Sequence, residues 1–88
     1  MSWNYRILAH KSNNDDMYLQ IHEVYYNENN IPIAYTKNPI SIGGTDIDEI
    51  LWVIDKIRDA VNKPILLAGE KFPNEYRNED LNKSDEYQ

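Results

Sequence analysis

Three stretches in the first half of the chain alternate between apolar and polar residues, which is the period-two pattern of β-strands with one buried face. The three stretches are residues 3–10, 17–26 and 31–37. Short polar runs separate them, SNNDD and NENN, whose Asn and Asp residues tolerate the positive φ of tight turns. Pro32 cannot donate to a ladder, so we expect the third stretch at a sheet edge.

The segment that follows, GTDIDEILWVIDKIRDAV, repeats apolar residues every three or four positions, as an amphipathic helix does. The stripe expected to be buried consists of Ile47, Ile50, Leu51, Ile54, Ile57 and Val61. Thr45 is the predicted N-cap, with Asp48 three residues on as its capping-box partner. Pro64 predicts the end of the helix, because the residue before a proline avoids the α region.

These elements predict an α+β domain over residues 1–67, a three-stranded antiparallel sheet packed on one helix in the order β-β-β-α. The short apolar run ILL at 65–67 could add a fourth strand or lean on the core. Residues 68–88 are highly charged and have no hydrophobic period, so we expect an acidic, disordered tail. The apolar residues of this tail could also pack back on the domain or fold onto a partner.

Composition narrows the class of protein. A chain of 88 residues forms one small domain, and the lack of cysteine excludes disulfides and zinc–thiolate sites. Neither a signal-peptide pattern nor a long apolar run is present, so we expect a cytoplasmic protein. Fifteen acidic and nine basic residues give a net charge of −6, which repels phosphate backbones and disfavours nucleic-acid binding. An acidic protein can instead bind a basic surface of another protein.

Trp52 does not fit the stripe expected to be buried. At about 100° per residue it lies nearly opposite that stripe. Its neighbours on that face are Asp48, Asp55 and Asp59. The face could simply be solvated, with Lys56 over the indole and Asp59 paired with Lys63. Alternatively, it could be a contact surface for a basic protein partner or for a second copy, because tryptophan buries much area with few rotatable bonds.

One helix can cover only one side of the sheet, so we expect the other side to be open to water. That side would carry, among others, Arg6, Tyr18, His22 and Tyr26. A half-polar open face is ordinary for an antiparallel sheet. It could also be a dimer or partner interface, or a small-ligand surface. A single-strand nucleic-acid platform would need the same residue types, but the net charge disfavours it.

Candidate chemistry is sparse. His10 and His22 could approach each other across the first two strands, but no further ligand accompanies them at metal-binding spacing. We therefore expect no metal and no cofactor. The sequence has no GxSxG motif and no phosphate-binding glycine loop, and we interpret Gly43 and Gly44 as a turn. These features favour a non-enzymatic protein.

Two resemblances add to this interpretation. The stretches MSWNYRI, IHEVYYNENNIPIAYTKNPISIGG and NKPIL, spread over residues 1–67, resemble a family of short uncharacterised bacterial and phage proteins. That family implies no activity and no functional residues. The pattern of three strands followed by a turn and GTDIDEI is similar to HicB-type antitoxin domains. Those domains usually carry a separate DNA-binding segment, which is missing here, and Ile50 replaces a typically small residue.

The HicB-type resemblance implies a protein-binding fold. Together with the acidic charge, it favours an inhibitor or antitoxin in a phage–bacterium or toxin–antitoxin setting. One alternative is an oligomer that binds or sequesters a small ligand through the open sheet face. Another is an enzyme whose site is assembled between subunits.

Overall fold

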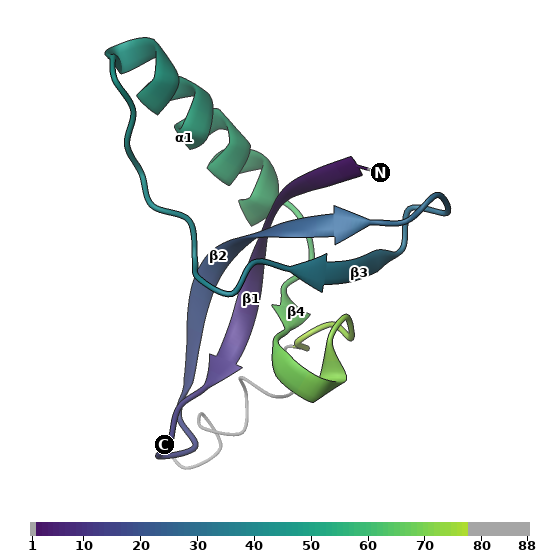
Figure 1. Cartoon of the computed structure of the whole chain (residues 1–88). Coiled ribbons are helices and arrows are strands. Elements are labelled where there is room, and N and C mark those ends of the chain that lie inside the picture. Colours follow the sequence, from purple (N-terminus) through teal and green to yellow (C-terminus); the bar gives the residue numbers. More distant parts are fainter. Residues whose placement is uncertain (1, 78–88) are drawn as a thin grey trace.

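The computed structural model describes residues 2–77 and shows an α+β fold with one helix and one sheet (Figure 1). Its elements are β1 (Ser2–Lys11), β2 (Met17–Tyr26), β3 (Pro32–Tyr35), α1 (Ile47–Val61), β4 (Leu66–Leu67) and the 3-10 turn η1 (Gly69–Lys71). The sheet has four strands in the order β3-β2-β1-β4. The prediction of a three-stranded antiparallel sheet is therefore wrong in one respect, because β4 adds a fourth strand parallel to β1.

The β1–β2 hairpin forms the centre of the sheet. Its antiparallel register runs without interruption from Ser2↔Tyr26 to Lys11↔Met17. Strand β3 continues the antiparallel order at the edge of the sheet, as Pro32 predicted. Asn30, in the second hairpin loop, has φ 62°, which confirms the expected use of an asparagine at a positive φ. The period-two pattern was thus sufficient to find all three strands.

Helix α1 begins one residue later than predicted. The N-cap is Asp46, whose carboxylate accepts a hydrogen bond from the Glu49 backbone N–H at 2.9 Å. The Glu49 carboxylate in turn accepts from the Thr45 backbone N–H at 2.8 Å and from its hydroxyl at 3.0 Å. Gly44 is needed beside this cap, since a Cβ there would lie 2.6 Å from Cβ of Glu49. The reciprocal cap therefore pairs Asp46 with Glu49, and the predicted pairing of Thr45 with Asp48 is wrong.

Helix α1 lies against β1 with a different face from the one predicted. Val53 and Ala60 are its buried residues, and they pack on Tyr5 together with Ile7, Ile21, Ile40 and Ile57. Within the stripe expected to be buried, four residues are exposed: Ile47, Leu51, Ile54 and Val61. The helix is rotated so that the small Ala60 and the short Val53 approach the strand closely. Sequence periodicity located the apolar side of the helix but not the part that meets the sheet.

The second side of the sheet is covered, against expectation. Leu8, Val24 and Leu66 form a buried cluster there, and Tyr35 and Phe72 pack around it. The covering layer is the segment after β4, which returns along β4 through backbone hydrogen bonds from Leu67 to Asn74 and from Tyr76 to Ile65. The fold therefore continues past Leu67, and residues 68–77 are not a tail. The rest of the predicted tail, residues 78–88, lies outside the described residues.

Candidate functional site

A cluster of three aromatic rings joins the start of β1 to the middle of α1. The indole of Trp52 lies 6.4 Å from the rings of both Trp3 and Tyr5, edge-on to each, and Trp3 and Tyr5 are 5.5 Å apart. Tyr5 is buried, whereas Trp3 and Trp52 keep 44% and 48% of their surface exposed. Each indole therefore has one side anchored in the protein and one side in water.

The position of Trp52 follows from the rotation of α1. Val53 points at the sheet, so Trp52, one residue earlier, is turned by about 100° toward the edge of the contact. Lys56 lies one turn further on and places its Nζ 5.4 Å from the indole centroid, as expected for a cation–π contact. Trp3 and Tyr5 are the members of this cluster that the sequence did not assign to the site, and Trp3 is the one with an exposed ring. Its place on the helix-facing side of β1 was the available signal.

Asp48, Asp55 and Asp59 are all exposed on the same side of α1 as Trp52. The predicted pairing of Asp59 with Lys63 takes another form, because Lys63 Nζ donates to the backbone carbonyl of Asp59 at 3.4 Å. We call the set Trp3, Trp52, Asp48, Asp55 and Asp59 the acidic–aromatic surface. It combines anchored rings with solvated carboxylates.

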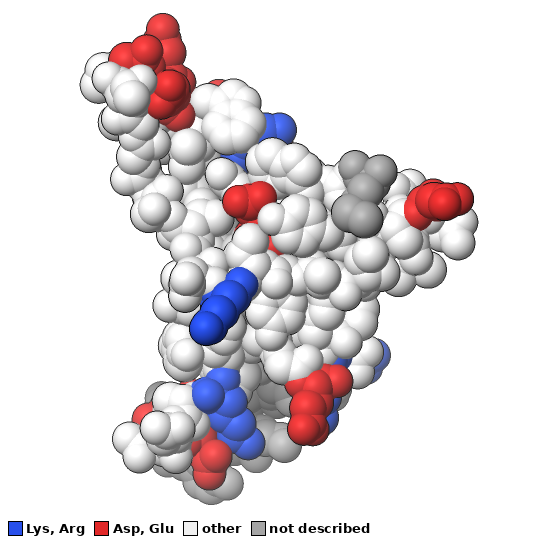
Figure 2. All heavy atoms as spheres, viewed as in Figure 1, with Lys and Arg blue, Asp and Glu red and all other residues white. Residues whose placement is uncertain are grey.

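Negative charge also gathers around this surface. Asp and Glu side chains crowd the N-terminal end of α1 (Figure 2). The carboxylate of Glu49 has its pKa lowered by the hydrogen bonds it accepts from Thr45, so it is ionised at neutral pH. Glu23 faces Tyr5 across the hairpin, and burial followed by the charge of Glu23 raises the pKa of the Tyr5 phenol. A shallow hollow of about 300 Å³ beside Trp52 is lined by Gly43, Glu49, Trp52 and Val53.

The residues proposed for the open sheet face are mostly inside the protein. Arg6 is 8% exposed, and its guanidinium donates to the Tyr26 hydroxyl at 2.9 Å and to the Pro64 carbonyl at 2.8 Å. The Tyr26 hydroxyl donates onward to Asn4 Oδ1 at 2.7 Å. Arg6 and Tyr26 thus tie the hairpin to the connection between α1 and β4. Among the residues proposed for this face, Tyr18 remains exposed.

His10 and His22 meet across the hairpin as predicted, with their Nε2 atoms 2.9 Å apart. The Nδ1 atom of His22 lies 2.8 Å from the Thr36 carbonyl, which can only accept, so Nδ1 carries the hydrogen. His10 Nε2 is then the donor to His22 Nε2. Burial, and then the neighbouring His22, lower the pKa of His10. The geometry is that of two rings joined by a hydrogen bond, and residues 2–77 contain no cluster of three or more His, Asp or Glu side chains that could hold a metal.

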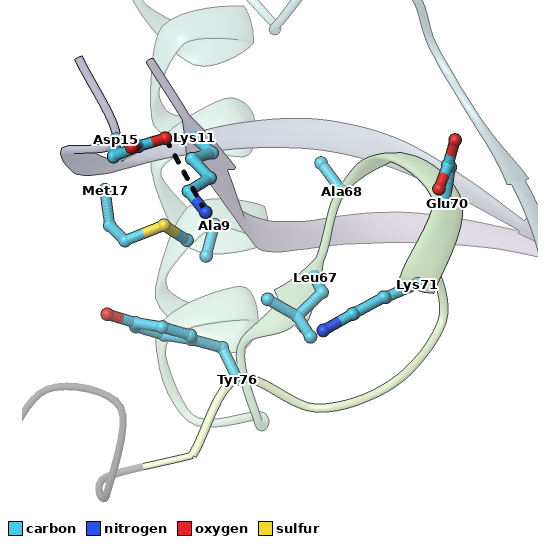
Figure 3. A pocket seen from close by; sticks show the side chains of 9 residues that line it. All are labelled: Ala9, Lys11, Asp15, Met17, Leu67, Ala68, Glu70, Lys71 and Tyr76. Atoms are coloured by element: carbon cyan, nitrogen blue, oxygen red, sulfur yellow. Dashed lines mark ion pairs between the residues drawn. The ribbon is translucent and has the colours of Figure 1, made fainter. Parts of the chain in front are cut away.

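A groove of about 540 Å³ opens between the hairpin turn and the segment after β4 (Figure 3). Its charged lining residues are Lys11, Asp15, Glu70 and Lys71. Lys11 and Asp15 form an ion pair at 3.7 Å across the turn. Sequence reasoning missed this groove because one wall is the segment that was expected to be disordered.

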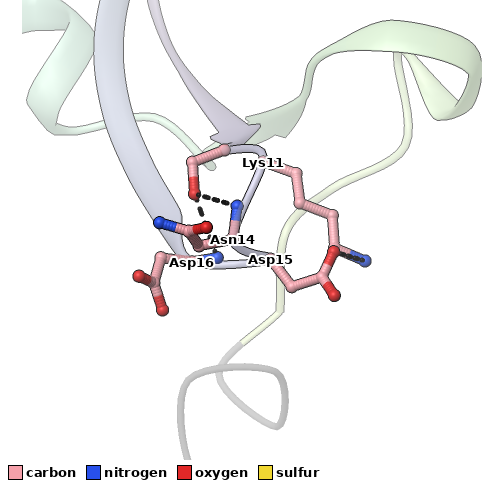
Figure 4. A network of polar contacts seen from close by, with 5 residues as sticks. Lys11, Asn14, Asp15 and Asp16 are labelled. Atoms are coloured by element: carbon pink, nitrogen blue, oxygen red, sulfur yellow. Dashed lines mark hydrogen bonds and ion pairs between the residues drawn. The ribbon is translucent and has the colours of Figure 1, made fainter.

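The turn beside the groove is held by local hydrogen bonds (Figure 4). The Ser12 hydroxyl accepts from the backbone N–H of Asn14 at 3.3 Å and of Asp16 at 3.2 Å, while Asp15 adopts φ 67°. These bonds form a side-chain-supported turn of the kind the run SNNDD predicts. The polar residues of the turn therefore have a structural role of their own.

Comparison with protein-family models, with curated proteins and with solved structures finds no match to this chain. The two resemblances noted from the sequence thus stay expectations. Within residues 2–77, no helix combines the length and the apolar character needed to cross a membrane. The geometry of the acidic–aromatic surface is therefore the main guide to function.

Proposed function

We propose that this protein is a non-enzymatic binding protein whose acidic–aromatic surface docks on a basic surface of another protein. The observation that carries the proposal is the pair of half-exposed indoles of Trp3 and Trp52, each anchored on one side by a buried contact. A ring held in this way offers a large contact area and loses little conformational entropy on binding. Scattered single apolar side chains would not offer this.

The carboxylates around the rings give the proposal its partner chemistry. Asp48, Asp55 and Asp59 are exposed beside Trp52, and the chain carries a net charge of −6. Such a field speeds the encounter with a basic partner and disfavours acidic ones. An inhibitor or antitoxin role in a phage–bacterium or toxin–antitoxin setting rests on the resemblances and is part of the proposal. We favour the small-ligand alternative less, because two of the residues it would use, Arg6 and His22, are buried.

Affinity capture from an extract of the source organism tests this proposal. We expect the wild-type chain to retain a basic protein, and Trp52→Ala to retain at least about tenfold less, since central tryptophans commonly dominate binding energy. Trp52→Ala should lower the free energy of unfolding by only about 1 kcal/mol, because half of the ring is already in water. Circular dichroism of the variant checks that the fold is kept.

A matched control separates this surface from exposed apolar area in general. Leu19 is 50% exposed in β2 and pairs with Ala9, six ladder positions from the pair of Trp3 and Tyr25, so Leu19→Ala should retain the partner fully. Replacing Asp48, Asp55 and Asp59 together by Asn should weaken capture most at low salt, where charge attraction is least screened. Equal capture by the wild type and by Trp52→Ala would disprove the proposal.

A further inference from the structure

Helix α1 carries two rows of apolar residues, and only one of them is used inside the described fold. The row packed on the sheet is Val53, Ile57 and Ala60, and Ile50, which is partly buried, continues it toward the start of the helix. The second row, which we call the outward seam, is Ile47, Leu51, Ile54, Arg58 and Val61. Its four apolar members keep 68%, 52%, 40% and 60% of their surface exposed, in the same order.

The spacing of the outward seam is that of a helix-pairing surface. Its members follow one another at intervals of four, three, four and three residues. This alternation places side chains along one line of a helix and is the repeat by which two helices interlock. Single exposed apolar residues are normal on a protein surface, whereas four along one line of a helix, interrupted only by Arg58, are not.

We propose that the outward seam pairs with the same seam of a second copy of this chain, with the two α1 helices antiparallel. The charges along α1 point to this occupant. The first turn and its cap are acidic, with Asp46, Asp48 and Glu49, whereas the last turn carries Arg58. Acidic side chains gather at the N-terminal end of α1 in Figure 2. An antiparallel pair brings each acidic end to the basic end of the other helix and also opposes the helix dipoles. A parallel pair would bring acidic ends together.

The spacing also fixes the register. If alternate seam positions face each other, Leu51 packs against Ile54 of the second copy at the centre. Arg58 then lies over Ile47 of the second copy at each end, where its aliphatic stem covers the apolar side chain. Its guanidinium extends to the acidic cap beyond, near Asp46 and Asp48. The one polar member of the seam thus has a charged partner only in the antiparallel arrangement.

This inference goes beyond the proposed function, since it does not use Trp52. That residue lies roughly 140° around the helix from the centre of the outward seam. Each copy in the pair keeps Trp3, Trp52, Asp55 and Asp59 of its acidic–aromatic surface free, and only Asp48, at the edge of that surface, lies near the second copy. A dimer would therefore present two partner-binding surfaces, and loss of the dimer would leave each surface intact.

Sedimentation equilibrium of the full chain over about 1 µM to 1 mM, at physiological salt, tests the pairing. We expect the wild type to pass from monomer to dimer within this range. Leu51→Asp should raise the dissociation constant at least about tenfold, because it places a charge at the centre of the seam. The matched control is Ile31→Asp, which changes a side chain of nearly equal exposure, 51% against 52%, and should leave the dissociation constant unchanged.

A charge exchange tests the orientation without removing apolar contacts. Arg58→Glu should weaken the dimer, and Asp48→Lys combined with Arg58→Glu should restore most of the loss. Circular dichroism confirms that each variant is folded. A wild type that stays monomeric throughout, or a dimer that is equally stable in Leu51→Asp, overturns the proposal. A double variant as weak as Arg58→Glu overturns the antiparallel arrangement. Because Asp48 also belongs to the acidic–aromatic surface, capture is compared between the wild type and Leu51→Asp, which changes no residue of that surface and should retain the partner fully.

Discussion

The two sides of the sheet are covered in contrasting ways. On one side, a regular amphipathic helix contributes only Val53 and Ala60 to the buried core. On the other side, a charged segment without any hydrophobic period closes over Leu8 and Val24, which have no exposed surface. Helix α1, which has the strongest hydrophobic pattern in the sequence, thus buries its side of the sheet less completely. The segment after β4, which has the least regular pattern, buries the other side more completely.

The difference teaches that amphipathicity measures how much apolar surface an element has to bury, not where that surface is buried. Helix α1 has more apolar surface than one narrow sheet can cover, and the excess faces outward. The segment after β4 needs only a few contacts, because it is held by backbone hydrogen bonds and by the Gly69 N–H donating to the Tyr35 hydroxyl at 2.8 Å. Gly69 permits this path with φ 85°.

The largest difference in the free energy of unfolding should be seen between two Leu→Ala substitutions, one in the second core and one on the outward side of α1. Leu8→Ala should lower the free energy of unfolding by about 3 kcal/mol, because it empties a fully buried site. Leu51→Ala should lower it by no more than about 0.5 kcal/mol in the monomer, since this side chain is 52% exposed. Urea denaturation at low protein concentration measures both. Similar losses would mean that α1 is buried more deeply than the described fold places it.

A smaller effect should come from the segment after β4. The Phe72 ring lies 4.8 Å from the ring of Tyr35 against the second core, so Phe72→Ala should cost about 2 kcal/mol of stability. Glu70→Ala, in the same segment but exposed, should change stability by less than about 0.5 kcal/mol. Thermal unfolding of both variants gives the comparison. A neutral Phe72→Ala would show that this segment does not unfold with the sheet.

The smallest effect should be a pH dependence of the free energy of unfolding that comes from His10, on the side of the sheet covered by the segment after β4. Because His10 has a lowered pKa in the folded protein, the unfolded chain binds more protons below its ordinary pKa of about 6.5. Stability should therefore be complete above about pH 7 and fall as the pH drops through 6.5 toward the lowered value. His10→Gln should flatten this part of the profile, whereas the exposed Tyr18→Phe should not. An unchanged slope in His10→Gln would assign the dependence to another group.

Much of the architecture was readable from the sequence because it depends on local periods. The strands at 2–11 and 17–26, the turn residues Asp15 and Asn30, and the helix ending before Pro64 all follow from alternation, turn chemistry and proline geometry. The candidate site was readable in part. Trp52 and the neighbouring Asp48, Asp55 and Asp59 lie on one face of the helix, and the helical repeat determines this without any tertiary contact.

The remainder depended on contacts between distant parts of the chain. Which row of α1 meets β1 is decided by how closely Ala60 and Val53 let the helix approach. Arg6 is buried against Pro64, 58 positions later in the chain, and His22 lies against Tyr35 and Thr36 at the end of β3. The sequence alone determined the elements and the faces they possess, since backbone geometry sets those locally. Only the tertiary structure decided which faces are shared, because burial is a property of two surfaces that must fit each other.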